Sequence, residues 1–264
     1  MQKSFIVRLR NFNPMKIRTL PKYIGYCLLL TLPVIVAGRL EKKTLPPLLP
    51  TITYYLPADI KAEARSLFVN QLYDSIRLAD YGLQKNVLDL AIKGFSKLAL
   101  KGKLNRDSIL TIVDFSKPSC DKRLYVIDLK NEALLFNTLV AHGRNSGMEY
   151  ARSFSNIPSS RKSSLGFYIT QSTYRGDNGY SLRLQGVERN INDKALRRCI
   201  VMHGADYVNN DFLETSGMLG RSFGCPAIPM EVHQEIINTI KEGSCLFIYS
   251  PDKKYFKTST VLNG

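Results

Sequence analysis

The strongest constraint on the fold is a change of residue pattern near position 108. Before it, apolar residues recur at helical spacing. After it, short runs rich in β-branched and aromatic residues are separated by turn residues. These runs cover residues 109–113, 124–129, 134–141, 167–170, 180–184, 200–202 and 245–249. Many short strands separated by turns predict a mainly β domain, which we place at residues 107–257.

Two helical patterns precede this domain. The first places an apolar face along residues 60–79 and stops near Gly82, and the second runs along residues 88–99 to Gly102. We therefore predict an α+β fold, in which a helical segment at 58–106 packs on the β domain. One late helix is predicted near residues 230–241, with His233 on its solvated face.

The N-terminal region has the pattern of an export signal. Residues 1–38 carry six basic and no acidic side chains, and the apolar run 23–38 ends in Ala37-Gly38. This predicts a cleaved signal peptide, with an uncleaved membrane anchor as the alternative. Residues 39–57 contain four prolines and resemble an extended tether. Both alternatives place the protein outside the cytoplasm.

The net charge of the chain is +15, which favours anionic partners such as nucleic acid, acidic glycans or membrane surfaces. No nucleic-acid-binding motif accompanies this charge, and the export signal argues against a nucleic-acid partner. The three histidines and five cysteines show no metal-ligand spacing, so no metal site is expected.

One cysteine stands apart from the others. Cys199 and Cys245 lie in apolar, strand-like runs, where cysteine usually acts as a small buried hydrophobe. Cys225 lies in a glycine-containing loop, residues 220–227, and His203 closes a strand-like run 22 positions upstream. A thiol becomes a nucleophile when an imidazole takes its proton. The structural alternative is that Cys225 belongs to a disulfide of an exported chain.

The residues around Cys225 suggest how such a site would work. Gly224 allows close backbone approach, and Pro226 has no N–H, so the N–H groups of Gly224 and Cys225 are the expected oxyanion donors. The Gly204 carbonyl is a candidate to orient the His203 ring. Ser222 also fits a G-x-S-x-G pattern, but that motif needs a strand before it and a helix directly after it, where prolines stand here.

These residues carry a resemblance to a known family. His203-Gly204 followed by Ser222-Phe223-Gly224-Cys225 resembles the signature of YkuD-type L,D-transpeptidases, and most closely the murein L,D-transpeptidase catalytic domain branch. The similarity runs from about Tyr81 to Tyr255. It includes segments 114–119, 141–147, 154–156, 163–168 and 179–184.

The resemblance implies a β-sandwich-like catalytic domain with Cys225 as nucleophile, His203 as base and the Gly204 carbonyl as orienting group. It implies attack on the third residue of a peptidoglycan stem peptide, release of D-alanine, and transfer of the thioester to an amine, without a cofactor. The family usually carries an aliphatic residue and an arginine after the cysteine, whereas Pro226-Ala227 follow here. Arg144, Arg183 and Arg221 are candidate replacements.

Further residues are predicted to contact the substrate: Ser222, Arg221, His142, Asn145, Ser164, Tyr180 and Arg183. For His142 and Asn145 an ordinary turn is the alternative interpretation. The predicted function is an exported transpeptidase whose partners are stem peptides, with an anionic wall polymer and, for an uncleaved anchor, the membrane as further partners. The alternatives are a carboxypeptidase or endopeptidase acting on the same peptides, and a non-catalytic wall-binding module.

Overall fold

A computed structural model describes residues 58–264 of the chain. The predicted signal or anchor at 1–38 and the tether at 39–57 lie outside the described residues. Within residues 58–264, no helix is long and apolar enough to cross a membrane.

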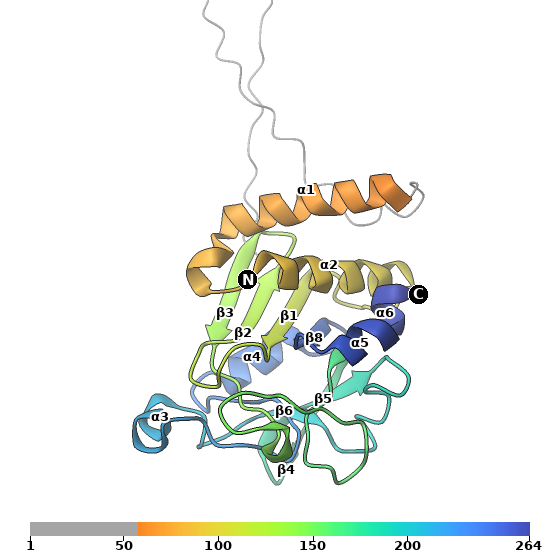
Figure 1. Cartoon of the computed structure of the whole chain (residues 1–264). Helices are drawn as coiled ribbons and strands as arrows, with labels where there is room; N and C mark the ends of the chain where they lie inside the picture. The colour runs from red at the N-terminus through yellow and green to blue at the C-terminus, as the bar shows by residue number, and fades with distance from the viewer. Residues whose placement is uncertain (1–57) are drawn as a thin grey trace, which may run out of the picture. The chain divides into compact units, whose positions relative to one another are not determined.

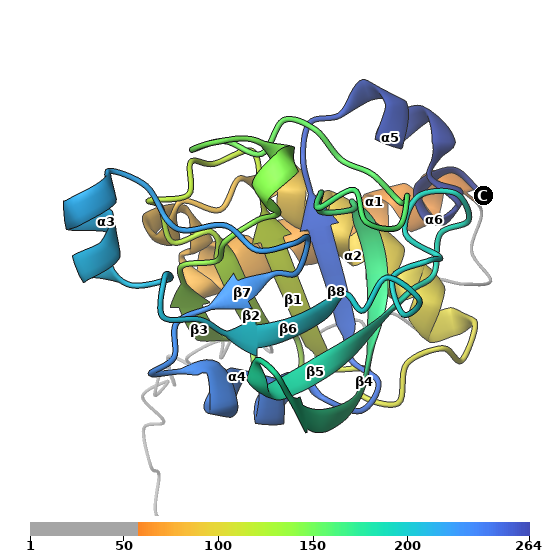
Figure 2. The same cartoon turned by 90° about the horizontal axis from the view of Figure 1, so that it is seen from below.

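Eight strands form one mixed sheet in the order β3-β2-β1-β8-β4-β5-β6-β7 (Figure 2). The strands are β1 (Ile109–Asp114), β2 (Leu124–Asp128), β3 (Ala133–Thr138), β4 (Gly166–Gly176), β5 (Gly179–Gly186), β6 (Val201–Gly204), β7 (Ala227–Ile228) and β8 (Cys245–Tyr249). Two neighbouring pairs, β1–β8 and β6–β7, are parallel, and the other pairs are antiparallel. The parallel β6–β7 pair is where the predicted histidine and cysteine segments meet.

Helices cover the sheet in layers. The helical elements are α1 (Ala58–Ile76), η2 (Leu78–Tyr81), α2 (Lys85–Leu100), η3 (Arg144–Ser146), α3 (Asn210–Ser216), α4 (His233–Ile240), α5 (Lys253–Thr258) and α6 (Thr260–Asn263). Helix α2 packs on β1 and β8, and α1 packs on α2 (Figure 1). Helix α4 contacts β5 and β6. The two N-terminal helices thus share one hydrophobic core with the sheet.

The predicted fold class, α+β with a mainly β domain preceded by helices, is confirmed. Each predicted run contains or overlaps a strand, although the run 134–141 ends as a strand at Thr138. The two-residue strand β7 and the short helices α3, α5 and α6 were not predicted. The domain boundaries at 58, 107 and 257 stay a prediction.

Helix α2 is shaped by an apolar stripe and one glycine. Its side chains at Val87, Leu88, Ala91 and Phe95 are buried against the sheet. Gly94 faces Phe167, whose ring stacks on Phe247 with 4.2 Å between ring centroids. A Cβ atom at position 94 would lie 2.0 Å from Phe167 Cζ, so only glycine lets the helix approach this closely.

We expect Gly94→Ala to lower the free energy of unfolding by roughly 1–3 kcal/mol, because an extra methyl group overpacks a core whose rings are already stacked. The opposing gain in helix propensity is about 1 kcal/mol. Urea unfolding followed by circular dichroism measures the difference. The half-buried Lys93→Ala serves as control in the same helix, and equal stability of the two variants would contradict the packing account.

Candidate active site

The loop of residues 220–227, called the cysteine loop below, is fixed by its own hydrogen bonds. The Ser222 hydroxyl accepts from Gly224 N at 3.0 Å and donates to the Cys225 carbonyl at 2.7 Å. Bridges from Ala141 to Ala227 and from Gly143 to Ser222 tie the loop to the segment before η3. Ser222 therefore builds the loop. It is buried, and its contact with a substrate stays a prediction.

Gly224 is required by the loop geometry. Its φ of 126° lies in the region that favours glycine, and a Cβ atom there would lie 2.8 Å from the Lys162 carbonyl oxygen. Its N–H is donated to Ser222 Oγ, and its expected role as an oxyanion donor stays a prediction. Within residues 58–264, no acceptor is found for the N–H of Cys225. The N–H of Cys225 is therefore available to donate to an oxygen that becomes negatively charged.

His203 lies near the end of β6, paired with Ser181 of β5 and Ala227 of β7. Its Nδ1 lies 2.8 Å from the Gly204 carbonyl oxygen. A carbonyl can only accept, so Nδ1 carries the proton and Nε2 keeps its lone pair in the neutral ring. Burial, and secondarily the charge of His233, lower the pKa of His203 below its ordinary 6.5. At neutral pH the ring is therefore an unprotonated base.

Cys225 is a free, buried thiol beside β6. Its Sγ accepts from Val201 N at 3.4 Å and faces the Cys199 carbonyl oxygen at 3.6 Å. Burial raises the pKa of the thiol to about 11, against the smaller opposite effects of the Val201 N–H and Arg198. In the described structure no hydrogen bond joins Sγ to the His203 ring. The thiol is thus neutral and needs a base to become a nucleophile.

Arg198 was missed by the sequence analysis, and it lies beside Cys225. Its guanidinium donates to the carbonyls of Ser155 and Lys162 at 2.6 Å each, and also to Ser160 Oγ and Ser164 Oγ. A Cβ atom at Gly224 would lie 3.4 Å from its Nη2. Arg198 therefore holds the segment around 155–164 against the cysteine loop and places a positive charge near the thiol.

His142 differs from His203 in which nitrogen of its ring carries the proton. It is fully buried, and Arg123 Nη2 lies 2.9 Å from its Nδ1. An arginine can only donate, so His142 Nδ1 accepts and the proton lies on Nε2, which faces the Gly147 carbonyl at 3.4 Å. Burial and the charge of Arg123 lower its pKa to about 4. His142 supports the loop through its carbonyl, which accepts from Ser222 N, and contact of its side chain with a substrate stays a prediction.

Two further predicted contacts lie elsewhere. The Ser164 hydroxyl is buried between Tyr168 and Arg198. Tyr180 alternates with Ser181 along β5, so it projects from the face opposite His203, and its hydroxyl donates to Asn238 of α4 at 2.8 Å. Both hydroxyls are thus bonded within the protein, and contact of either residue with the substrate stays a prediction.

Three polar residues of the predicted set remain accessible. Asn145 is exposed, and its side chain donates to the Ser160 carbonyl at 2.9 Å. Arg221 is half-buried and caps the η3 turn through the Gly147 carbonyl at 3.2 Å. With Arg144 it lines a pocket of about 260 Å³ at the start of the cysteine loop. Arg183 lies over the Tyr174 ring at 4.2 Å, on the His203 face of β5.

His233 corrects a further expectation. It is 6% exposed, not solvated, and its Nδ1 lies 2.6 Å from the Met230 carbonyl. A Cβ atom at Gly204 would lie 2.8 Å from its Cγ, so Gly204 is what allows this ring to pack behind His203. Helical periodicity alone placed His233 on the outer face. The packing of α4 on β6 could not be read from that pattern. In residues 58–264 no cluster of three metal-ligating side chains is present.

Comparison with known proteins gives one family. Residues 79–249 match the family model described as L,D-transpeptidase catalytic domain. The match contains β1 to β8, His203 and Cys225. A comparison with curated protein sequences finds no match.

Several solved structures are similar at low identity. An L,D-transpeptidase from Mycobacterium smegmatis is 10% identical, with a TM-score of 0.34, and the alignment covers 54% of this chain and 59% of that chain. An L,D-transpeptidase from Stackebrandtia nassauensis is 12% identical, with a TM-score of 0.33 and coverage of 63% and 68%. A fused Zn-dependent amidase/peptidase/peptidoglycan-binding domain-containing protein from Clostridium acetobutylicum is 18% identical, with a TM-score of 0.34 and 62% of each chain covered. This chain thus spans less than two thirds of the mycobacterial and clostridial proteins.

Proposed function

The chain belongs to the family of L,D-transpeptidase catalytic domains, and from that premise we propose that it is a cysteine acyltransferase of peptidoglycan. The observation that carries the proposal is the pair of Cys225 and His203 at the β6–β7 junction. The histidine is neutral and oriented by Gly204, and the thiol is free. The donor is a tetrapeptide stem, and the acceptor is an amine.

The first step converts the thiol into the attacking group. Rotation of the Cys225 side chain away from Val201 N brings Sγ toward His203 Nε2, which takes the proton. The sulfur then attacks the carbonyl of the third stem residue, and the oxygen becomes an anion. The N–H of Cys225 stabilises this charge. Enzymes without bound substrate often hold such pairs apart. The missing hydrogen bond between Cys225 Sγ and the His203 ring therefore does not oppose the step.

The second step breaks the peptide bond. His203 returns its proton to the nitrogen of the terminal D-alanine, which leaves as a free amino acid, and a thioester remains on Cys225. An acceptor amine then attacks the thioester carbonyl and gives its proton to His203, and the thiol is regenerated. With water in place of the amine the product is a shortened, uncross-linked stem. The same residues thus support transfer and hydrolysis.

The arginine that the family usually carries after its cysteine is absent, and arginines at two other sites of this chain take its place. Arg198 supplies the charge close to the thiol and braces the cysteine loop. Arg144 and Arg221 line the small pocket at the start of the loop, where they suit a carboxylate of the stem peptide. We assign that pocket to substrate binding, with Asn145 at its edge on the neighbouring turn.

Export and location in the cell envelope belong to the same proposal. They rest on the basic residues and apolar run of residues 1–38 and on the wall substrate of the family. An anionic wall polymer is a suitable partner for the basic surface.

Product analysis separates the possible activities. Full-length protein is incubated with a purified tetrapeptide muropeptide, and the products are identified by mass spectrometry. A cross-linked dimer lacking one D-alanine supports the transpeptidase. A tripeptide alone identifies a carboxypeptidase, and no product together with a thiol that resists alkylation identifies a binding module.

A prediction about Arg198 tests its role as a positioning residue. We expect Arg198→Gln to slow alkylation of Cys225 by iodoacetamide by roughly two- to ten-fold at mildly alkaline pH, because the nearby charge favours the thiolate. The alkaline midpoint of the alkylation rate should move upward. Arg198→Lys should restore part of the rate, since it keeps the charge. An unchanged pH profile in Arg198→Gln, with normal folding, would contradict this role.

A further inference from the structure

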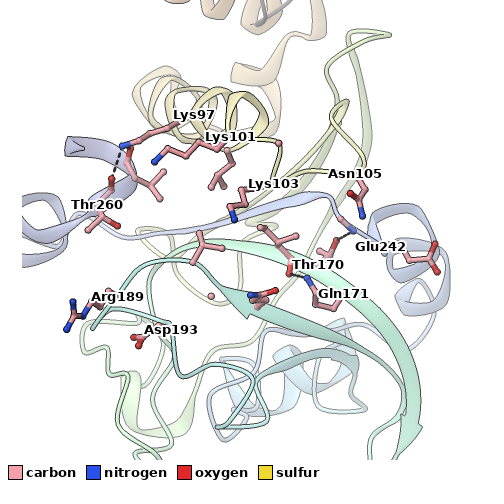
Figure 3. Close-up of a pocket in the computed structure, with 18 of the residues that line it drawn as sticks. Lys97, Lys101, Lys103, Asn105, Thr170, Gln171, Arg189, Asp193, Glu242 and Thr260 are labelled. Atoms are coloured by element: carbon pink, nitrogen blue, oxygen red, sulfur yellow. Dashed lines mark hydrogen bonds between the residues drawn. The ribbon is translucent and has the colours of Figure 1, made fainter. Parts of the chain in front are cut away.

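A second cavity lies apart from the cysteine loop, and its chemistry is that of an anion site. It has a volume of about 980 Å³ and lies between the end of α2, the middle of β4, the end of β5 and α6 (Figure 3). Basic side chains line it from two sides: Lys97, Lys101 and Lys103 around the end of α2, and Arg189 after β5. We propose that this cavity binds carboxylate groups of the wall peptides, outside the reaction centre. The identification of the peptide rests on the proposed function.

The cations of this cavity lack partners inside the protein. Lys101, Lys103 and Arg189 are exposed, and among residues 58–264 none of them forms an ion pair within 4.0 Å. Lys101 and Lys103 project from the end of α2 over β4 (Figure 3). Their charges are gathered at one concave surface and none is held in an ion pair, which leaves them available to a multivalent anion.

Two acidic side chains also line the cavity, so its four basic side chains leave a net positive charge of about two. Asp193 is already used by the protein, because it accepts from Asn156 Nδ2 at 2.7 Å and from Asn190 N at 2.8 Å. Glu242 lies at the far end of the cavity from Lys97 and Lys101 (Figure 3). Lys97 is the one lysine of the group with a structural task, since it donates to the Thr260 carbonyl at 2.8 Å. Burial lowers the pKa of Lys97, and the like charges of Lys101 and Lys93 lower it further.

The position of the cavity relates it to the reaction centre. Gln185 lines the cavity, and Ser181, four residues earlier on β5, pairs with His203. Residues two apart on a strand share a face, so Gln185 and Ser181, the partner of His203, lie on the same face of β5, about 13 Å apart along the strand. That span equals about four residues of extended peptide. Arg183 lies between Ser181 and Gln185 on β5, and it donates to the hydroxyl of Ser172, a residue that also lines the cavity.

This geometry favours a peptide over a free small anion. A stem peptide whose reacting carbonyl lies at Cys225, or the stem beside it, is long enough for its carboxylates to reach the cavity. Lys101, Lys103 and Arg189 would bind these carboxylates. Binding there raises the local concentration of wall substrate at Cys225 without taking part in bond breaking.

A binding measurement on full-length protein tests the cavity directly. The probe is fluorescein-labelled hexaglutamate, followed by anisotropy at low ionic strength, with hexaglutamine as uncharged control. The test variant is K101Q/K103Q. The matched control is K122Q/K130Q, which removes two exposed lysines beside β2 that do not line the cavity.

We expect hexaglutamate to bind, K101Q/K103Q to weaken binding about five-fold or more, and K122Q/K130Q to change it less than two-fold. Equal weakening by both variants would overturn the proposal, because it would show an effect of net charge alone. No binding of hexaglutamate, or binding of tripolyphosphate only, would also overturn it.

Catalysis is tested separately, so the two proposals fail independently. The Cys225→Ala protein should bind hexaglutamate as tightly as the unmodified chain, whether or not the protein proves to be a transpeptidase. In active protein, K101Q/K103Q should raise KM for intact peptidoglycan while leaving kcat on a soluble tetrapeptide unchanged. A fall in kcat on the soluble peptide would overturn the assignment of the cavity to binding outside the reaction centre.

Discussion

Replacing Cys225 by alanine is expected to reduce D-alanine release from a tetrapeptide stem by about four orders of magnitude or to background. The reason is that the thiol forms the covalent bond of the intermediate, and no other described nucleophile can take its place. Ser222, three positions earlier, has its hydroxyl engaged by Gly224 N and the Cys225 carbonyl. The measurement is liquid chromatography of released D-alanine and of the peptide products.

The other free cysteines provide matched controls for this loss. Cys120 and Cys199 are exposed thiols outside the cysteine loop, so Cys120→Ala and Cys199→Ala should keep activity within about two-fold. Cys225→Ala should also unfold at nearly the same temperature as the unmodified chain, since it removes a single small sulfur atom. Activity that survives in Cys225→Ala would contradict the assignment of the nucleophile.

Replacing His203 by glutamine is expected to lower the rate by about 10²–10⁴-fold, the usual contribution of a general base. The free thiol of Cys225, whose pKa burial raises to about 11, is then left neutral at pH 7. The rate should rise with pH in this variant, because hydroxide must remove the proton that His203 normally takes. The measurement is kcat/KM for D-alanine release across the pH range.

In the unmodified protein, the pH–rate profile should have an acidic limb. Its rate should fall as pH drops below the ordinary histidine pKa of 6.5, because burial lowers the pKa of His203 and only the unprotonated ring accepts a proton. His142→Gln is the control: it removes the Nδ1 that faces Arg123 Nη2, so it should lower stability and leave the acidic limb in place. An acidic limb that persists in His203→Gln would contradict His203 as the base.

The sequence predicts the strands because their signal is local. Alternating or continuous apolar runs mark β1 to β6 and β8 without knowledge of their neighbours. Strand β7 has two residues, too short for any periodicity, and it exists only because Ala227 pairs with His203. The same holds for the short helices α5 and α6, which are held by the buried carboxylate of Glu188 through Tyr255 and Ser259.

The site was predictable only where its residues belong to a motif. Cys225, His203 and Gly204 follow from the loop and the strand that carry them, and their positions in space agree with that pattern. Arg198 has no motif, because its role comes from contacts with a segment more than 30 residues earlier. Polar residues within the motif segments, such as Ser164 and His142, are read as surface groups from sequence, whereas burial assigns them to the support of the loop.

The central claim, that Cys225 forms an acyl intermediate with a stem peptide, is tested most directly by intact-protein mass spectrometry. Full-length protein is mixed with tetrapeptide muropeptide, quenched in acid within seconds to minutes, and digested to locate the adduct. The account predicts a mass increase equal to the stem without its terminal D-alanine, on the peptide that contains Cys225, and no increase in Cys225→Ala. An adduct on another residue, or D-alanine release with no dependence on Cys225, would contradict it.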